Sequence, residues 1–327
     1  MSAEEQSEDA VQALDVAPAE DLIHETSAPT MPMRRIDRSG IVLAALGAIA
    51  FSGKAIIVKL GFRYGADAVT LLALRMAVAL PFFAGMGVWA ARRAPKLGRA
   101  DRWRILALGF FGYYLASFLD FAGLAYITAT LERLILYLTP TLVLLIGVAF
   151  ARRRPTRLQL AALGTSYLGV LLAFGHDLDH GGGDILLGGG LVFGSALAYA
   201  IYLYGSGEIV SRIGAVRLTA YASSVAGALC IGQFLLLRPF DALALPSQVY
   251  WLSLLNGTAC TVLPVLATML AVKRIGSATA AQIGMLGPVS TIVLSLCVLG
   301  EPMGSWQVAG TLLVMAGIFV VSRQRVA

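Results

Sequence analysis

The fold class of this chain is decided by residues 274–321, RIGSATAAQIGMLGPVSTIVLSLCVLGEPMGSWQVAGTLLVMAGIFVV. The only charged residues in this segment are Arg274 and Glu301, and the rest forms two long apolar stretches. An α-helix needs about 20 predominantly apolar residues to cross the hydrocarbon core of a bilayer. The segment therefore predicts two membrane-spanning helices, at 277–299 and 304–322, joined by a short turn.

The same pattern extends over most of the 327 residues. Hydrophobic residues make up 58% of the chain and charged residues only 13%, whereas a soluble protein carries roughly 25% charged residues. We therefore predict an all-α polytopic membrane protein. Ten spans are expected, at 40–61, 68–91, 104–125, 128–150, 157–175, 185–205, 216–237, 249–271, 277–299 and 304–322.

The first 37 residues differ from the rest because they are acidic and rich in Ala and Pro. They lack helical periodicity of apolar residues, and they lack the basic start and apolar core of a signal peptide. We expect residues 1–37 to form a disordered cytoplasmic tail. Two units of five spans each are expected to follow, at 38–176 and 184–323.

The basic residues indicate the orientation of the spans. Those outside the spans gather at the two terminal flanks and in the loops after the even-numbered spans; only Arg63 and Arg238 lie in the alternate loops. Cytoplasmic loops are enriched in Lys and Arg. We therefore expect both termini on the cytoplasmic side of a bacterial inner (plasma) membrane.

An internal repeat relates the two units through a shift of 148 residues. The identities that this shift aligns are Ile127/Ile275, Ile135/Ile283, Leu138/Leu286, Pro140/Pro288, Gln159/Gln307, Ala161/Ala309 and Gly169/Gly317. Because each unit has an odd number of spans, the second unit should be inverted relative to the first. The two aligned prolines interrupt helix hydrogen bonding and predict matching kinks.

The segment quoted above resembles the closing part of an EamA-type domain of the drug/metabolite transporter (DMT) superfamily. The residues that carry the resemblance are Pro288, the Gly300-Glu301-Pro302 turn, Gly310 and Gly317. Residues 126–150, YITATLERLILYLTPTLVLLIGVAF, resemble the same domain without the Gly-Glu turn. The resemblance covers about residues 40–322. It implies a ten-helix bundle with a central substrate cavity.

Away from the span ends, charged residues occur in the first unit only: Lys54, Lys59, Arg75, Asp120, Glu132 and Arg133. Ionisable groups in hydrocarbon are expensive and usually face a cavity or a partner. The helical rise of 1.5 Å per residue places these groups at one level, where they sum to +2. Two interpretations stay open. The charges pin the helices together, with Arg75 paired to Asp120, or Lys54 or Arg133 faces a water-filled pocket and attracts a carboxylate.

Four uncharged residues complete the candidate substrate-binding or coupling site: Tyr137, Tyr199, Tyr202 and Gln282. For each of them, packing between helices is the alternative. Glu132 is also a candidate carrier of a coupled proton. The three cysteines, Cys230, Cys260 and Cys297, lack metal-ligand spacing, so we expect buried thiols and no metal.

The pattern favours a secondary transporter of a small polar metabolite, anionic or zwitterionic, such as an amino acid. No Walker motif is present, so ATP should not drive it directly. A lipid or lipid-linked sugar flippase is the alternative, and a membrane sensor or scaffold is less favoured. The spans contain no His and one Asp, which argues against an enzyme. We expect no cofactor and no nucleic-acid partner; the expected partners are a small-molecule substrate, membrane lipids and, in one alternative, a second copy in a homodimer.

Overall fold

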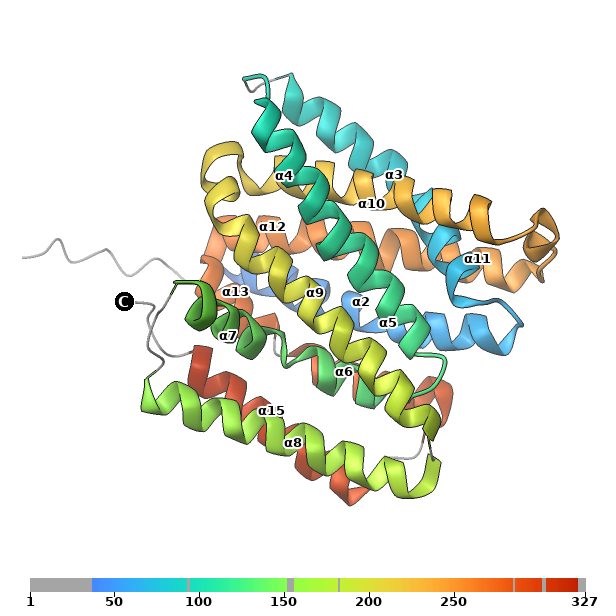
Figure 1. The fold of residues 1–327 in the computed structure, drawn as a ribbon, viewed down its shortest axis with the longest axis vertical. Coiled ribbons are helices and arrows are strands. Elements are labelled where there is room, and N and C mark those ends of the chain that lie inside the picture. The colour runs from blue at the N-terminus through green and yellow to red at the C-terminus, as the bar shows by residue number, and fades with distance from the viewer. Residues whose placement is uncertain are drawn as a thin grey trace, which may run out of the picture. The chain divides into compact units, whose positions relative to one another are not determined.

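The computed structural model describes residues 37–92, 95–151, 156–181, 183–284, 286–301 and 304–322. Every regular element in these ranges is a helix, which agrees with the predicted all-α class (Figure 1). Apart from Asp37, the expected N-terminal tail at 1–37 lies outside the described residues.

The α-helices are α2 (Arg38–Arg63), α3 (Ala68–Ala91), α4 (Arg99–Gly109), α5 (Ala116–Gly123), α6 (Ala129–Leu136), α7 (Thr139–Ala151), α8 (Arg157–Gly181), α9 (Gly183–Ile213), α10 (Ala215–Leu237), α11 (Ser247–Gly257), α12 (Leu263–Ile275), α13 (Ser277–Gly284), α14 (Leu286–Leu294) and α15 (Ser305–Ser322). Three π-helical turns continue them: η1 (Phe110–Leu115), η3 (Thr258–Val262) and η4 (Ser295–Leu299). A 3-10 turn, η2 (Phe240–Leu243), lies between α10 and α11.

Within the described residues, seven helical segments are long and apolar enough to cross a membrane. They are Arg38–Arg63, Ala68–Ala91, Arg99–Gly123, Ala129–Phe150, Asp184–Gly207, Ala215–Leu237 and Ser247–Ile275, and shorter apolar helices occupy Leu163–Ala173 and Leu286–Leu299. The chain is therefore a polytopic membrane protein. The other expected spans coincide with α8, α13 to η4, and α15 but fall short of these criteria over the described residues, so the count of ten stays a prediction.

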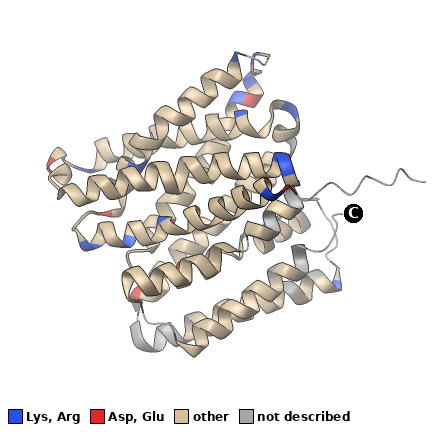
Figure 2. Cartoon of the chain, turned by 180° about the vertical axis from the view of Figure 1, so that it is seen from behind, with Lys and Arg blue, Asp and Glu red and all other residues tan. Residues whose placement is uncertain are grey.

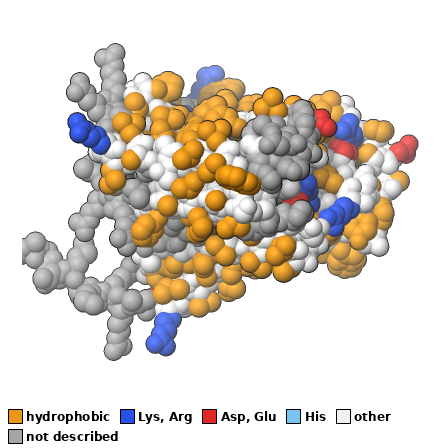
Figure 3. All heavy atoms as spheres, turned by 90° about the horizontal axis from the view of Figure 1, so that it is seen from below, with side chains coloured by type: hydrophobic (Ala, Val, Ile, Leu, Met, Phe, Trp, Pro, Cys, Tyr) orange, Lys and Arg blue, Asp and Glu red, His pale blue; other side chains and the backbone are white. Residues whose placement is uncertain are grey.

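The surface agrees with a lipid environment. Lys and Arg lie mostly toward the ends of the helices (Figure 2), and hydrophobic side chains cover much of the described face seen in Figure 3. Cys230 and Cys260 are buried as expected, but the prediction for Cys297 is wrong because that thiol is exposed. An apolar helix in a bilayer can turn a small side chain toward lipid at no cost, so hydropathy alone does not separate the two cases.

The helix ends differ from the expected span ends. The expected spans end at 175 and resume at 185, but α8 is helical as far as Gly181 and α9 begins at Gly183. The helix α9 also continues to Ile213, well past the expected end at 205. Hydropathy marks only the part of a helix that lies in hydrocarbon, whereas backbone hydrogen bonds continue the helix into polar residues.

The packing of the helices repeats between the two halves of the chain. Helix α3 packs on α10, and α8 packs on α15 along one edge of the bundle in Figure 1. Helix α2 packs on α12 and α14. In the same way, α9 packs on α5 and α7. The 148-residue shift relates each of these helix pairs to its counterpart. The helices are therefore arranged with pseudo-two-fold symmetry. The same shift carries the first residue of η1 onto the first residue of η3.

The expected interruption near Pro140 is present. Helix α6 ends at Leu136 and α7 begins at Thr139, so Pro140 is the second residue of a new helix. This position suits proline because its missing N–H would have no partner in the first turn. The corresponding Pro288 lies within α14.

Two glycines set the distance between α8 and α15. A methyl group on Gly169 would lie 2.6 Å from the carbonyl oxygen of Gly310 and 2.9 Å from the backbone nitrogen of Val314. Gly310 in turn faces the Gly169 backbone. The backbones therefore meet directly, as small residues allow in membrane helices.

We predict that Gly169→Ala destabilises the protein by about 1–3 kcal/mol, because the new methyl meets backbone atoms that cannot rotate away. The matched control is Gly164→Ala on the same helix, where a methyl would find open space. Thermal unfolding of the detergent-solubilised protein measures the difference. Equal melting temperatures for the two variants would contradict this close packing.

Candidate functional site

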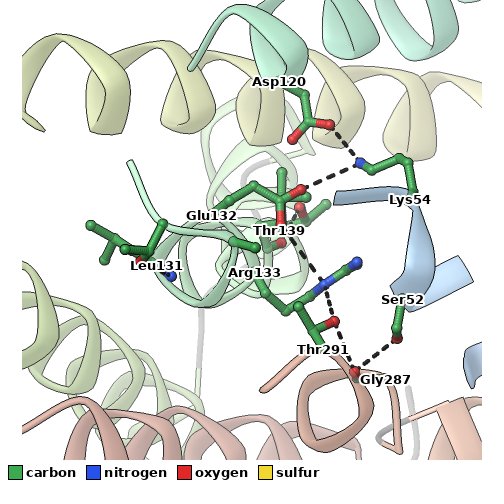
Figure 4. Close-up of polar contacts among 12 residues, drawn as sticks. Ser52, Lys54, Asp120, Leu131, Glu132, Arg133, Thr139, Gly287 and Thr291 are labelled. Atoms are coloured by element: carbon green, nitrogen blue, oxygen red, sulfur yellow. Dashed lines mark hydrogen bonds and ion pairs between the residues drawn. The ribbon is translucent and has the colours of Figure 1, made fainter. Parts of the chain in front are cut away.

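The charged residues predicted inside the spans converge in the interior of the bundle. Lys54 on α2 places its Nζ 2.5 Å from Oδ2 of Asp120 on α5 and 3.4 Å from Oε1 of Glu132 on α6 (Figure 4). All three side chains are buried. One ammonium group is thus shared by two carboxylates from different helices. The expected pairing of Arg75 with Asp120 is wrong, because the flexible lysine stem reaches Asp120 and Arg75 has another partner.

A chain of polar contacts continues from Glu132 into the second repeat (Figure 4). Arg133 Nε lies 3.9 Å from Oε2 of Glu132 and donates a hydrogen bond of 3.0 Å to Oγ1 of Thr291 on α14. Thr291 donates to the carbonyl oxygen of Gly287, which also accepts a 2.8 Å bond from Ser52 on α2. The network therefore links helices of both repeats.

Arg75 on α3 is held in a similar way. Its Nε donates a 2.8 Å hydrogen bond to Oγ1 of Thr261, and Thr261 donates its own proton to the carbonyl oxygen of Asn256 at 2.7 Å. The guanidinium carbon lies 5.3 Å from the ring centroid of Phe121. Nη1 of Arg75 is buried and has no hydrogen-bond partner among the described residues, and the same is true of Nη2 of Arg133.

These two threonines were missed by the sequence analysis. Thr261 and Thr291 both lie within apolar helices of the second repeat, and each uses its hydroxyl proton on a backbone carbonyl nearby in sequence. The oxygen is then left to accept from an arginine. A threonine inside a span gives only a weak sequence signal, because its hydroxyl can always bond to the preceding turn.

A cavity of about 420 Å³ lies beside this network. Six of the predicted site residues line it: Lys54, Arg75, Asp120, Arg133, Tyr137 and Tyr199. The other walls are largely apolar and aromatic, and they include Phe51, Met76, Phe83 and Leu203. Open space adjoins three cations, so a cation facing a pocket and charges that pin the helices both stay predictions.

Two of the remaining predicted residues, Glu132 and Tyr202, are not among the described residues that line the cavity. Glu132 is fully buried next to Lys54. The hydroxyl of Tyr202 lies 3.2 Å from that of Tyr113, and its ring stacks on Tyr199 with centroids 5.6 Å apart. The side chain of Gln282 lies outside the described residues.

The cavity is chemically asymmetric although the fold repeats. The 148-residue shift places Tyr202 at the position of Lys54 and Ser223 at the position of Arg75. It also pairs Tyr113 with Thr261. The first repeat thus supplies cations where the second supplies neutral hydroxyl groups, so the pseudo-symmetry of the backbone does not extend to charge.

Lys59 does not belong to this cluster. Its Nζ lies 3.7 Å from Oε1 of Glu301, whose Oε2 accepts a 3.0 Å hydrogen bond from the backbone of Ala129 and another from Ser295. Gly300 adopts a left-handed conformation, with φ of 66°, that turns the chain here. The cluster at the cavity therefore has three cations and two anions, a net charge of +1 in place of the expected +2.

One end of the bundle is closed. An apolar cluster that includes Leu71, Leu72, Phe121, Leu124 and Leu299 lies on the side of the charged residues toward Glu301. Along α3, for example, these leucines precede Arg75, whereas the cavity residue Phe83 follows it. The cavity therefore lies on one side of the charged cluster and a dry core on the other.

Polar contacts reinforce the closed end. Arg63 donates a 2.5 Å hydrogen bond to the carbonyl oxygen of Leu299. Asp67 caps α3 by accepting from Val69 at 2.9 Å and lies 3.2 Å from Nε of Arg238. Burial opposes the ionisation of Asp67, but hydrogen bonds from Thr70 and the charge of Arg238 hold its pKa below the usual range.

Comparisons with known proteins agree with the sequence resemblance. The model of the EamA-like transporter family matches residues 38–175 and 186–323, which confirms two repeats. The chain is 29% identical over 291 residues to the uncharacterized transporter YcbK of Bacillus subtilis (strain 168), covering 86% of this chain and 91% of that protein. It is 26% identical over 263 residues to an uncharacterized transporter of Archaeoglobus fulgidus, covering 79% and 89%. A crystal structure of a protein with 16% identity aligns at a TM-score of 0.59, over 88% of this chain and 99% of that chain, and supports the fold alone.

We predict that Lys54→Met destabilises the protein more than Glu132→Gln does. Removing the lysine leaves two adjacent buried carboxylates without their cation, a change that costs roughly 3–5 kcal/mol at buried pairs. The double variant should lose less stability than the sum of the single losses, because one carboxylate is then neutral. Chemical unfolding in detergent measures this cycle, and strict additivity would show that the shared ammonium is unimportant.

Proposed function

Because the chain belongs to the EamA-like transporter family, we propose that it is a secondary transporter of a small polar metabolite of anionic or zwitterionic character. The observation that carries this proposal is the cavity of about 420 Å³ bordered by Lys54, Arg75 and Arg133. Small-molecule sites are concave, largely apolar and equipped with a few convergent polar groups. This cavity has that composition, and its cations come from three different helices.

We further propose that transport proceeds by alternating access. Two repeats related by a pseudo-two-fold axis can exchange conformations, so that the contacts of one repeat are adopted by the other. The present arrangement fits one end state, since the cavity adjoins one side of the charged cluster and the apolar core closes the other. Because Lys and Arg are enriched in cytoplasmic loops, the proposal has the cavity side of the charged cluster facing the cytoplasm.

This proposal uses ten spans in two inverted units, with both termini in the cytoplasm of a bacterial inner membrane. Segments α8, α13 to η4, and α15 supply the spans beyond the seven that meet the length and composition criteria. A permease of this kind needs no catalytic group, and we do not assign an enzymatic activity to the chain.

Flux through the purified protein in proteoliposomes tests the proposal. Amino acids, organic acids and nucleosides are offered with and without a pH gradient, and a fluorescent-lipid scrambling assay runs in parallel. We expect saturable flux of an anionic or zwitterionic solute and no lipid movement. Lipid movement without solute flux would support the flippase alternative and contradict this proposal.

We predict that Lys54→Ala and Glu132→Gln lower the solute flux at least about fivefold without preventing membrane insertion. Each removes one partner of a charge-assisted contact worth about 1.5–3 kcal/mol beside the cavity. The control is Lys273→Gln, which changes an exposed lysine in the last turn of α12. Wild-type flux in both site variants would assign the cluster to helix pinning.

Deletion of residues 1–36 separates transport from a scaffold role. All the described residues that line the cavity lie beyond this segment, so we expect flux to survive the deletion. Loss of flux from a correctly inserted, truncated protein would show that the tail takes part in function.

A further inference from the structure

We infer that the cargo is an organic monocarboxylate with an apolar or aromatic body, and that Arg75 binds its carboxylate. This inference rests on the proposed transport function and deepens it. It selects a net charge of −1 from the wider class of anions and zwitterions, and it selects one of the three cations at the cavity.

The first argument is the charge balance of the cavity wall. Lys54 lies 2.5 Å from Asp120 and 3.4 Å from Glu132, and Arg133 lies 3.9 Å from Glu132. Arg75 forms no ion pair with a carboxylate in the described part of the chain. Two anions thus serve Lys54 and Arg133, and one positive charge is left at Arg75. A monoanion neutralises this charge. A zwitterion leaves the net charge at the cavity positive, and a dianion makes it negative.

The second argument is the orientation of the guanidinium group. The bond from Nε to Thr261 and the Phe121 ring fix the plane of the Arg75 head group. Nη1 is buried and has no described hydrogen-bond partner, although Arg75 lines the cavity. Leaving a buried charged donor unpaired is costly. A planar guanidinium held in this way is prepared to bind a carboxylate.

The third argument concerns the rest of the cargo. Apart from the cations, the described walls consist mainly of aromatic and aliphatic side chains, including Phe51, Met76, Phe83 and Tyr199. Asp120 is the only carboxylate-bearing residue among the described lining residues, and Lys54 already holds it. Oδ1 of Asp120 has no described hydrogen-bond partner, but Lys54 already neutralises the charge of this carboxylate, so an ammonium group on the cargo would compete with that lysine. The cavity therefore suits a carboxylate attached to an apolar group.

Equilibrium binding to the full chain in nanodiscs, measured by calorimetry, tests the inference with four probes that share a phenyl ring. They are phenylacetate as the monoanion, phenylacetamide as its neutral analogue, phenylalanine as a zwitterion and phenylmalonate as a dianion. We expect phenylacetate to bind at least about tenfold more tightly than each of the others. Equal or tighter binding of phenylalanine or phenylmalonate, or no binding of phenylacetate, would overturn the inference.

Variants of Arg75 and its anchor identify the group that binds. Arg75→Gln should weaken phenylacetate binding about ten- to hundredfold, since a charge-assisted contact is lost. The same change should affect phenylacetamide much less. Thr261→Val keeps the charge but frees the guanidinium, and we expect a loss of severalfold. Lys273→Gln is the control for removing a distant positive charge.

Two measurements keep the inference separate from the proposed function. The relative affinities of the four probes are measured on the wild-type protein. This comparison therefore remains valid even if the Arg75→Gln variant misfolds. If phenylacetate binds but is not transported in proteoliposomes, the transport proposal is contradicted, whereas the inference that the cavity binds a monocarboxylate stands. Phenylalanine flux that is insensitive to phenylacetate would keep transport and overturn the monocarboxylate inference.

Discussion

The structure depends on one shared ammonium group. Two carboxylates from α5 and α6 meet at Lys54 of α2, in a region where the surrounding medium cannot solvate them. Burying such charges is tolerable only if each finds a partner. This requirement fixes how three helices approach one another, and it places Arg133 and Thr291 next in the polar chain. The cavity lies beside these polar groups.

Helix location and the repeat could be predicted from the sequence. Long apolar stretches admit one solution in a bilayer, since only a helix satisfies every backbone group internally. The aligned prolines and glycines indicated two repeats, and the family matches at 38–175 and 186–323 agree. The positions of the charged residues also indicated where a site would lie. These features depend on composition along the chain, which sequence displays directly.

The partners of each charge could not be predicted. Whether Lys54 or Arg75 reaches Asp120 depends on the rotation of three helices and on the reach of each side chain. Lys59 was counted in the expected charge of the cluster, but the turn at Gly300 brings Glu301 close to it. Hydroxyl groups that complete the site, such as that of Thr261, are ordinary in membrane helices. Only three-dimensional packing distinguishes them.

The unbalanced charge at the cavity has a consequence for energetics. One elementary charge moved through the whole membrane potential corresponds to about 2.3 kcal/mol for every 100 mV. An empty protein with a net charge of +1 at its centre therefore feels the electric field whenever that cluster shifts relative to the bilayer. A bound monoanion cancels the charge and makes the loaded form indifferent to voltage. The interior-negative potential of a cell would then act on the unloaded half of each cycle only.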